Sequence, residues 1–297
     1  MDNLKDKKIV ILGLGLIGGS LARALMARQV PCRIVGVGRN EALLQRARLD
    51  GCISAWSLDA RAACVDADIV VIAVPVLTIK EQLRQIADVL PAHAVITDVA
   101  SVKQAVVDVV AEVFGKVPDR FVPGHPIAGS EQSSYSAARA ELFVHRKVIL
   151  TPLPGTARDA LDLVTQLWAL TGAEVLQMSV SHHDEVLAAT SHLPHLLAFA
   201  LVDTLSRQGE SEEIFRYAAG GFRDFTRIAS SDPVMWRDIF LTNGPATVAI
   251  LDRFVDDLQH LRQALLDGDG GLLYETFKRA KQSRDRFMLR LQSVNEN

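Results

Sequence analysis

Three glycines near the N-terminus have the spacing of a phosphate-binding loop. Gly13, Gly15 and Gly18 follow the pattern G-x-G-x-x-G in the stretch GLGLIGGS, directly after an apolar run and at the start of a helical pattern. The first glycine permits a tight turn, the second lets the backbone approach a pyrophosphate, and the third lets the helix pack close to the strand. The amide-rich start of that helix then faces the phosphates. The loop therefore predicts a dinucleotide site.

The end of the next strand-like run, IVGVGRN at residues 34–40, lacks the acid that usually selects NAD. In an NAD site, a carboxylate there accepts a hydrogen bond from the 2′-hydroxyl of the adenosine ribose. Here Gly38 leaves space, and Arg39 offers a planar pair of donors that suits a 2′-phosphate. A solvated turn arginine is the alternative. The stretch favours NADP, with NAD as the second choice. The residues expected to bind the cofactor are Gly13, Gly15, Leu16, Ile17, Gly18, Gly38, Arg39, Asn40, Val74 and Pro75.

A histidine and a serine in the first half of the chain are suited to moving a proton. His125 follows an apolar strand, in the region where doubly wound sheets bind ligands, and imidazole titrates near neutrality. Ser101 ends another apolar run and occupies a comparable position. The structural alternatives are a turn histidine bonded to the backbone and a serine that caps the following helix. The residues alone leave these alternatives open.

Two further histidines, His192 and His195, lie three residues apart on one face of a predicted helix, with Pro194 between them. An H-x-x-H pair can bind zinc, but no third ligand has suitable spacing in this sequence. We therefore expect no metal.

Length and composition limit the function classes. The 297 residues, 49% of them hydrophobic, are enough for two domains. The formal net charge of −3 gives no reason to expect nucleic acid or an acidic membrane as partner. An odd number of cysteines, Cys32, Cys52 and Cys64, without metal-ligand spacing favours a reduced cytoplasmic protein. Glycines interrupt the N-terminal apolar run, and no uninterrupted apolar run is long enough to span a membrane.

Two patterns of hydrophobicity divide the chain. Up to about residue 179, short β-branched runs alternate with amphipathic stretches, and several runs are apolar throughout, as expected of strands buried on both faces of a parallel sheet. This predicts a Rossmann-type, doubly wound α/β domain over residues 1–179. The runs expected to be strands cover residues 9–15, 33–38, 68–75, 94–101, 120–126, 147–152 and 173–179.

Almost no strand pattern follows residue 179. A helix is predicted to begin with Ser181 as its N-cap, because Asp184 follows three residues later. We expect an all-helical domain over residues 180–297, whose apolar faces could cover a core or a second subunit. Its expected helical segments cover residues 186–208, 212–219, 234–265 and 271–292.

Five stretches, in order over nearly the whole chain, resemble the prephenate/arogenate (cyclohexadienyl) dehydrogenase family of tyrosine biosynthesis. Besides GLGLIGGS they are TDVASVK (97–103), GHPIAGSE (124–131), SHLPHLLAFAL (191–201) and GFRDFTRIASSDPVMWRDI (221–239). The resemblance implies an oxidative decarboxylation in which hydride passes to NAD(P)+, CO2 is lost, and a cyclohexadiene becomes aromatic. The products would be 4-hydroxyphenylpyruvate from prephenate and L-tyrosine from arogenate, and the helical domain would form a homodimer.

The resemblance also assigns roles to individual residues. His125 would be the base for the substrate hydroxyl, with Ser101 hydrogen-bonded to His125 or to that hydroxyl. Arg227 would hold the ring carboxylate. His195 would bind substrate with His192 close by, Glu131 would gate or polarise the pocket, and Trp236 would help to close it. We expect His182 and His183 to be a solvated helix start.

Two other classes of protein share some of these features. One is another two-domain NADP-dependent dehydrogenase, of the β-hydroxyacid dehydrogenase or imine reductase type. Those enzymes present a catalytic lysine or aspartate on the first long helix after the nucleotide domain, whereas this chain has SHLPH there. The other is a non-catalytic NADP-binding dimeric sensor, which would have no use for His125, Ser101 and Arg227 together.

Overall fold

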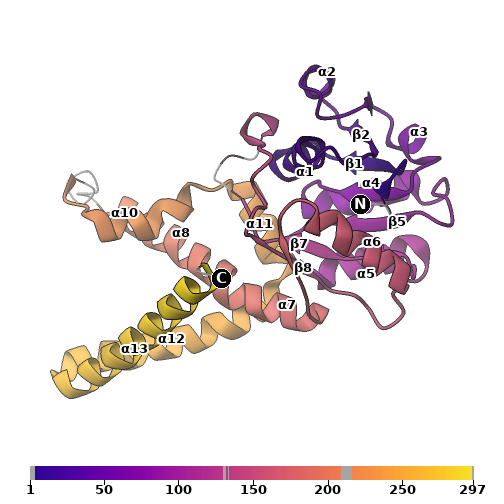
Figure 1. The fold of residues 1–297 in the computed structure, drawn as a ribbon. Helices are drawn as coiled ribbons and strands as arrows, with labels where there is room; N and C mark the ends of the chain where they lie inside the picture. Colours follow the sequence, from indigo (N-terminus) through magenta and orange to yellow (C-terminus); the bar gives the residue numbers. More distant parts are fainter. Residues whose placement is uncertain (1–3, 130–131, 133, 209–215, 296–297) are drawn as a thin grey trace. The chain divides into compact units, whose positions relative to one another are not determined.

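The computed structural model describes residues 4–129, 132, 134–208 and 216–295, with side chains described as far as residue 290 (Figure 1). The chain forms two compact units, Met1–Thr247 and Val248–Asn297. The division falls inside helix α12 (Gly244–Asp267). The predicted domain boundary at residues 179 and 180 marks instead a change from α/β to helical structure. That domain division stays a prediction.

A parallel sheet of six strands dominates the first unit. The strand order is β3-β2-β1-β4-β5-β6, so the direction of winding reverses between β1 and β4. In open α/β sheets, ligands bind at the carboxyl ends of the strands beside such a reversal. The strands are β1 (Lys8–Leu12), β2 (Arg33–Val37), β3 (Ala55–Ser57), β4 (Ile69–Ile72), β5 (Val95–Asp98) and β6 (Phe121–Val122).

Helices cover both faces of this sheet, which confirms the doubly wound fold. Along β1, Ile9 and Ile11 belong to one buried cluster, whereas Val10 and Leu12 belong to another. Alternate side chains of a strand point to opposite faces, so both faces of the sheet are buried. The helices are α1 (Leu16–Ala27), α2 (Glu41–Leu49), α3 (Ala60–Cys64), α4 (Ile79–Ile86), α5 (Gln104–Phe114) and α6 (Arg158–Ala169).

A second, three-stranded sheet corrects one expectation. The predicted strand at 120–126 is broken at Pro123 into β6 and β7 (Gly124–Pro126). Strand β7 pairs antiparallel with β8 (Lys147–Leu150), and β8 pairs parallel with β9 (Glu174–Gln177). Proline has no amide hydrogen to donate to a sheet, so the chain changes sheets there. The change places His125 in the new sheet, opposite Ile149.

The helical part begins at a different cap from the predicted one. The side chain of Ser179, not Ser181, accepts the amide hydrogen of His182 at 3.3 Å and caps α7 (Val180–Leu187). A π-helical turn, Ala188–His192, leads into α8 (Leu193–Ser206). The first half of the predicted segment 212–219, residues 212–215, lies outside the described residues.

The remaining helices surround a break that the periodicity did not predict. The expected helix at 234–265 is divided at Asn243 into α11 (Pro233–Thr242) and α12. Before it come α10 (Gly220–Thr226) and the 3₁₀ turn Arg227–Ser230, and the chain ends in α13 (Gly270–Asn295). At the break, the side chain of Asn243 donates to the backbone of α7 and contacts His192.

One helical stretch, Val180–Ser206, is long and apolar enough to cross a membrane by length and composition alone, with a mean hydropathy of 1.4. Core helices of water-soluble proteins meet the same criterion. This stretch contains His183 and Asp184, which are buried against the sheet domain.

Candidate active site

The glycine loop has the geometry that its spacing predicts. Gly13 has φ +100°, and a Cβ placed on it would lie 2.4 Å from the carbonyl oxygen of Ala73. A Cβ on Gly18 would lie 2.1 Å from the carbonyl oxygen of Gly13. Gly15 is the N-cap residue of α1 and leaves the first amides of the helix without a side-chain cap. The turn is therefore tight, closely packed, and open at a helix N-terminus, as a pyrophosphate site requires.

The end of β2 has room for a nucleotide substituent. A Cβ placed on Gly38 would meet only Leu44, at an ordinary 3.7 Å. Arg39 follows and is exposed. The side chain of Asn40 has a structural role, because it accepts the amide hydrogen of Leu43 at 3.1 Å and caps α2. Which residues contact a cofactor stays a prediction.

His125 lies in a buried chain of hydrogen bonds beside the carboxyl end of β5. Only 8% of the residue is exposed, and its Nδ1 lies 2.9 Å from Nε2 of His183. His183 in turn donates from Nδ1 to Oδ1 of Asp184 at 2.8 Å. The expectation that His183 belongs to a solvated helix start is wrong, since it is fully buried, whereas His182 beside it is exposed.

Asp184 joins this chain to the N-terminus of α5. Its two carboxylate oxygens accept the backbone amides of Lys103 at 2.8 Å and of Gln104 at 2.9 Å. A carboxylate at a helix N-terminus is stabilised by the unpaired amides and by the helix dipole. Helix α7 is thereby attached to the sheet domain, and His183 acquires a fixed orientation.

A buried ion pair holds the backbone next to His125. Lys103 and Asp98, both 0% exposed, form a salt bridge. The same lysine donates to the carbonyl of Gly124 at 2.7 Å, and Asp98 accepts the amide of Gly124 at 3.2 Å. Both polar groups of Gly124 are thus held by this pair, and the residue after it is His125.

Ser101 is half-buried, three residues after the end of β5. The alternative that it caps the following helix is wrong, because the N-cap residue of α5 is Lys103 and the cap acceptor is Asp184. Within the described residues Ser101 and His125 share no hydrogen bond. A bond from Ser101 to the substrate hydroxyl therefore remains as its predicted role. Glu131 lies outside the described residues.

His192 is fully buried between α7 and α11. Its Nδ1 accepts from the Asn243 side chain at 3.1 Å, and the same amide donates to the backbone carbonyl of Asp184 at 2.9 Å. Because Nδ1 accepts, the proton of the neutral ring is on Nε2, which has no partner among the described residues. The Trp236 indole nitrogen is likewise buried without a partner. Unsatisfied buried donors are costly and are typical of a site that binds a polar ligand or water.

His195 stacks on Trp236, with ring centroids 3.7 Å apart, and its Nδ1 donates to the Ser191 carbonyl at 2.9 Å. Trp236 is 6% exposed and also packs against Phe240. Arg227 is exposed, but its charge acts on His195. The structure therefore brings the neighbouring His192 and His195 together with Trp236 on α11 and with Arg227 on the turn before it.

Burial keeps these histidines neutral. It lowers the pKa of His125 well below its usual range, and electrostatic interactions with His183, Lys103 and His192 lower it further. Burial also lowers the pKa of His183 against the opposing effect of Asp184, and lowers the pKa of His192 to about 4. For Asp184 burial opposes ionisation, but hydrogen bonds from His183, Gln104 and Lys103 outweigh it and lower the pKa.

The sequence reasoning missed Asp98, Lys103, His183, Asp184 and Asn243. Lys103 and Asp98 lie in the stretch TDVASVK, in which Ser101 is the predicted site residue. The nearby end of an apolar strand could have marked Asp98 and Lys103 as candidates. No local pattern could have marked Asn243, because its partners are 51 and 59 residues away in the sequence.

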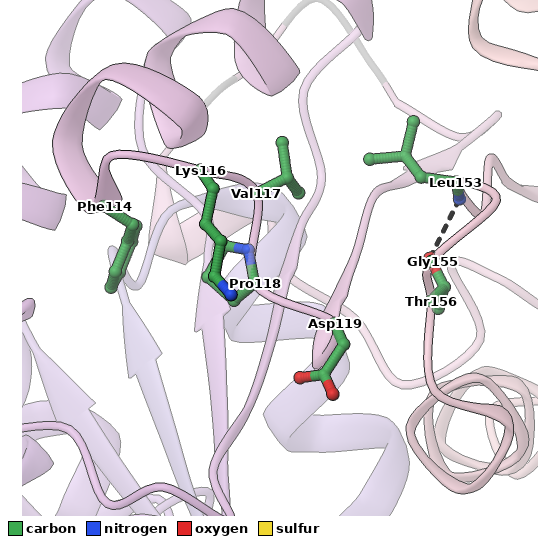
Figure 2. A pocket seen from close by; sticks show the side chains of 8 residues that line it. All are labelled: Phe114, Lys116, Val117, Pro118, Asp119, Leu153, Gly155 and Thr156. Atoms are coloured by element: carbon green, nitrogen blue, oxygen red, sulfur yellow. Dashed lines mark hydrogen bonds between the residues drawn. The ribbon is translucent and has the colours of Figure 1, made fainter.

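A pocket elsewhere in the sheet domain contains none of the predicted site residues (Figure 2). It is bounded by the loop after α5 and the loop after β8, where Thr156 accepts the amide of Leu153 at 2.9 Å. Its lining residues are Phe114, Lys116, Val117, Pro118, Asp119, Leu153, Gly155 and Thr156.

Comparison with known families matches both parts of the chain. Residues 21–177 match the nucleotide-binding domain of prephenate dehydrogenase, and residues 179–279 match its dimerization domain. This chain belongs to the prephenate dehydrogenase family. The match confirms the predicted fold class and the resemblance on which the site residues were chosen, and it removes support from the β-hydroxyacid dehydrogenase and imine reductase alternatives.

Individual relatives agree with this family assignment. The chain is 39% identical over 281 residues to a cyclohexadienyl dehydrogenase of Zymomonas mobilis, covering 94% of this chain and 95% of that one. It is similar to the structure of prephenate dehydrogenase from A. aeolicus in complex with hydroxyphenyl propionate and NAD+, with TM-score 0.89, 37% identity, and 96% and 99% of the two chains covered. It is also similar to the structure of Synechocystis arogenate dehydrogenase, with TM-score 0.81, 26% identity, and 94% and 99% covered.

Removing the buried cation should destabilise the protein strongly. The variant Lys103→Met leaves the Asp98 carboxylate buried without its partner, and we expect the free energy of unfolding to fall by about 3–5 kcal/mol. The matched control is Lys7→Met, which breaks a partly exposed pair with Asp68 and should cost less than about 1 kcal/mol. Urea denaturation measures both. Equal losses in the two variants would mean that the buried pair contributes no more to the free energy of unfolding than the partly exposed pair.

Acidification should unfold the protein through its buried histidines. His192, which faces Asp184, His183 and His195, has a folded pKa of about 4, against about 6.5 when unfolded. Between these values the unfolded chain binds more protons, so the free energy of unfolding decreases as pH falls from about 6.5 toward 4. His192→Asn should flatten this dependence, whereas substitution of exposed His182 by Asn should not. Urea denaturation over this pH range tests the prediction, and an unchanged slope for His192→Asn would contradict it.

Proposed function

We propose that this chain is a nicotinamide-dependent dehydrogenase that oxidatively decarboxylates prephenate, L-arogenate or both, in tyrosine biosynthesis. The products would be 4-hydroxyphenylpyruvate and L-tyrosine, respectively. The observation that carries the proposal is the buried, neutral imidazole of His125, held beside the carboxyl end of β5 in a chain of this family. A neutral imidazole in a site shielded from water is suited to accept a proton from a hydroxyl group.

The residues of the glycine loop fit a dinucleotide. Gly13 and Gly18 leave space that a side chain would fill, and Gly15 exposes the first amides of α1. We propose that these glycines hold the pyrophosphate, with Leu16, Ile17, Val74 and Pro75 around the rest of the cofactor. When bound, the nicotinamide supplies the acceptor for the hydride that leaves C4 of the substrate.

The protein's own contribution to the reaction is a proton acceptor and a place for the carboxylate. His125 takes the proton of the C4 hydroxyl as hydride leaves that carbon, and Ser101 donates to the same oxygen. The bond between C1 and the ring carboxylate then breaks, CO2 is released, and its electron pair completes the aromatic ring. The proton returns to the ring oxygen, giving the phenol.

We assign substrate binding to the cluster around Trp236. Arg227 pairs with the ring carboxylate, and His195 lies within its electrostatic reach. Because the charge of the carboxylate disperses on loss of CO2, this grip aids binding more than rate. The unpartnered donors of His192 and Trp236 are available to an oxygen of the substrate or of a bound water. Glu131 is proposed to act at the pocket mouth, on the resemblance alone.

A homodimer is the assembly that we propose. The helical unit Val248–Asn297 has many large apolar side chains that are exposed in the single chain, and such patches are typical of interfaces. They include Val255, Leu258, Leu265, Leu266, Leu272, Tyr274, Phe277 and Phe287. The matched dimerization domain supports the same assembly. Light scattering coupled to gel filtration would test it. We propose a cytoplasmic location because the three cysteines are free.

Kinetics with each substrate and each cofactor test the function. We expect NAD(P)+ reduction with prephenate, arogenate or both. His125→Asn keeps an amide near the position of Nδ1 but removes the base, so kcat should fall by about 10²–10⁴-fold, with cofactor affinity nearly unchanged. His182→Asn is the control and should be silent. No turnover with either substrate would refute the activity, and equal loss of turnover and cofactor binding would make His125 structural.

Cofactor choice should depend on the turn after β2. We propose NADP as the preferred cofactor, because Gly38 leaves space and Arg39 is exposed beside it. The double variant Gly38→Asp with Arg39→Ala supplies a carboxylate for the ribose hydroxyl and removes the guanidinium. The ratio of kcat/KM for NAD+ to that for NADP+ should then increase. A wild type that already prefers NAD+ would contradict this proposal while leaving the activity intact.

A further inference from the structure

We propose that His183 and Asp184 are positioning residues that determine which nitrogen of His125 carries the proton. The inference rests on the proposed role of His125 as the base. It assigns a purpose to two buried residues that the proposed reaction does not otherwise use.

The Asp184 carboxylate can only accept hydrogen bonds. It accepts two from the backbone amides of Lys103 and Gln104, at 2.8 and 2.9 Å, and these amides cannot change direction. Among the described residues, its third hydrogen-bond partner is the Nδ1 of His183, at 2.8 Å. His183 must therefore carry a hydrogen on Nδ1. The amides at the start of α5 also favour the ionised carboxylate, so this end of the chain is set.

The second nitrogen of His183 then sets His125. A neutral His183 with hydrogen on Nδ1 has a lone pair on Nε2, and this atom lies 2.9 Å from Nδ1 of His125. His125 must donate from Nδ1, which leaves its Nε2 without a hydrogen. Nε2 is the only other nitrogen of the ring, so it is the one available as a base. The opposite tautomer would point an N–H at the substrate hydroxyl.

Burial keeps His183 neutral against the two carboxylates beside it, and so keeps the direction of the chain fixed. His183 is fully buried and faces Lys103, Asp98 and Asp184. Lys103 is already paired with Asp98, so a second cation at His183 would be desolvated beside an existing one. His125 faces Lys103 and His192 as well as His183. The arrangement resembles the aspartate and histidine of serine hydrolases, lengthened by one imidazole.

Protonation of His125 needs no rearrangement in this arrangement. When Nε2 takes a proton, Nδ1 continues to donate to His183, and the charge of Asp184 stabilises the imidazolium through the intervening ring. Groups oriented before the reaction lower its barrier because they do not have to reorganise. The expected effect of the pair is thus on turnover more than on cofactor binding.

Asp184→Asn tests the inference on activity. Oδ1 of Asp184 contacts both the Lys103 amide and His183, whereas Oδ2 accepts from Gln104. An asparagine whose NH2 takes the place of Oδ1 loses the Lys103 bond and keeps the Gln104 cap through its oxygen. Its NH2 then donates to His183 and reverses the chain. We expect kcat to fall by about 10²–10⁴-fold, since the corresponding Asp→Asn change in the serine-protease triad costs about 10⁴-fold. KM for the cofactor should be nearly unchanged. The control is Asp59→Asn, because Asp59 also caps a helix through two amides, those of Arg61 and Ala62, and forms no hydrogen bond with a histidine in the described part of the chain.

A pair of substitutions at His183 separates positioning from packing. The carbonyl oxygen of a glutamine can accept from Nδ1 of His125 as His183 does, whereas a leucine fills the space without an acceptor. We expect His183→Gln to keep turnover within about 10-fold of the wild type and His183→Leu to lose about 10²-fold or more, as loss of a general base does. Equal losses in the two variants would assign His183 a packing role only and would overturn the inference.

Nitrogen NMR of ¹⁵N-histidine-labelled protein measures the tautomer without any activity. In the wild type the His125 signals should show hydrogen on Nδ1 and none on Nε2, and Asp184→Asn should reverse this. A wild type with hydrogen on Nε2, or a reversed variant that keeps full turnover, would overturn the inference. A wild type that shows the expected tautomer but reduces no NAD(P)+ with prephenate or arogenate would instead overturn the proposed function.

Discussion

The structure around the candidate base depends on a salt bridge that water does not reach. Asp98 and Lys103 are both fully buried, and together they hold the amide and the carbonyl of Gly124. Removing two charges from water is expensive, and the cost is recovered only where further hydrogen bonds satisfy the remaining donors and acceptors. Here those hydrogen bonds are made with the backbone of Gly124, the residue before His125. The buried pair therefore fixes the backbone next to His125, and with it the position of that side chain.

A second carboxylate extends this arrangement to the helical part of the chain. Asp184, on α7, caps α5 of the sheet domain, and its backbone carbonyl accepts from Asn243 at the start of α12. Three helices distant in sequence thus meet at one residue. Any shift of α7 would break two sets of contacts at once. These are the hydrogen bonds that Asp184 accepts from the backbone amides of α5 and the hydrogen bond between His183 and His125. The cluster of His192, His195 and Trp236 is attached to the same helices, so one framework holds the candidate base and the cluster proposed to bind substrate.

Burial of the three histidines lowers stability in acid and also keeps the proposed base neutral. Three imidazoles, those of His125, His183 and His192, are buried and have lowered pKa values, which makes the folded state sensitive to acid. An apolar core at these positions would not carry this sensitivity. Burial also keeps the rings neutral at physiological pH, and a base must be unprotonated to act. The two consequences have one physical origin, the desolvation of the charged ring.

Local spacing was sufficient for some features of this protein and insufficient for others. Gly13, Gly15 and Gly18, the apolar strands and the family resemblance follow from neighbouring residues, because a turn, a buried strand or a helix start is a local property. The break at Pro123, the burial of His183 and the cap from Asp184 to α5 depend on residues far apart in the chain. The direction of the His125 ring depends on them as well. Sequence alone identified the candidate base; only the tertiary structure, by desolvating Lys103, Asp98 and three histidines together, decided how that base is held.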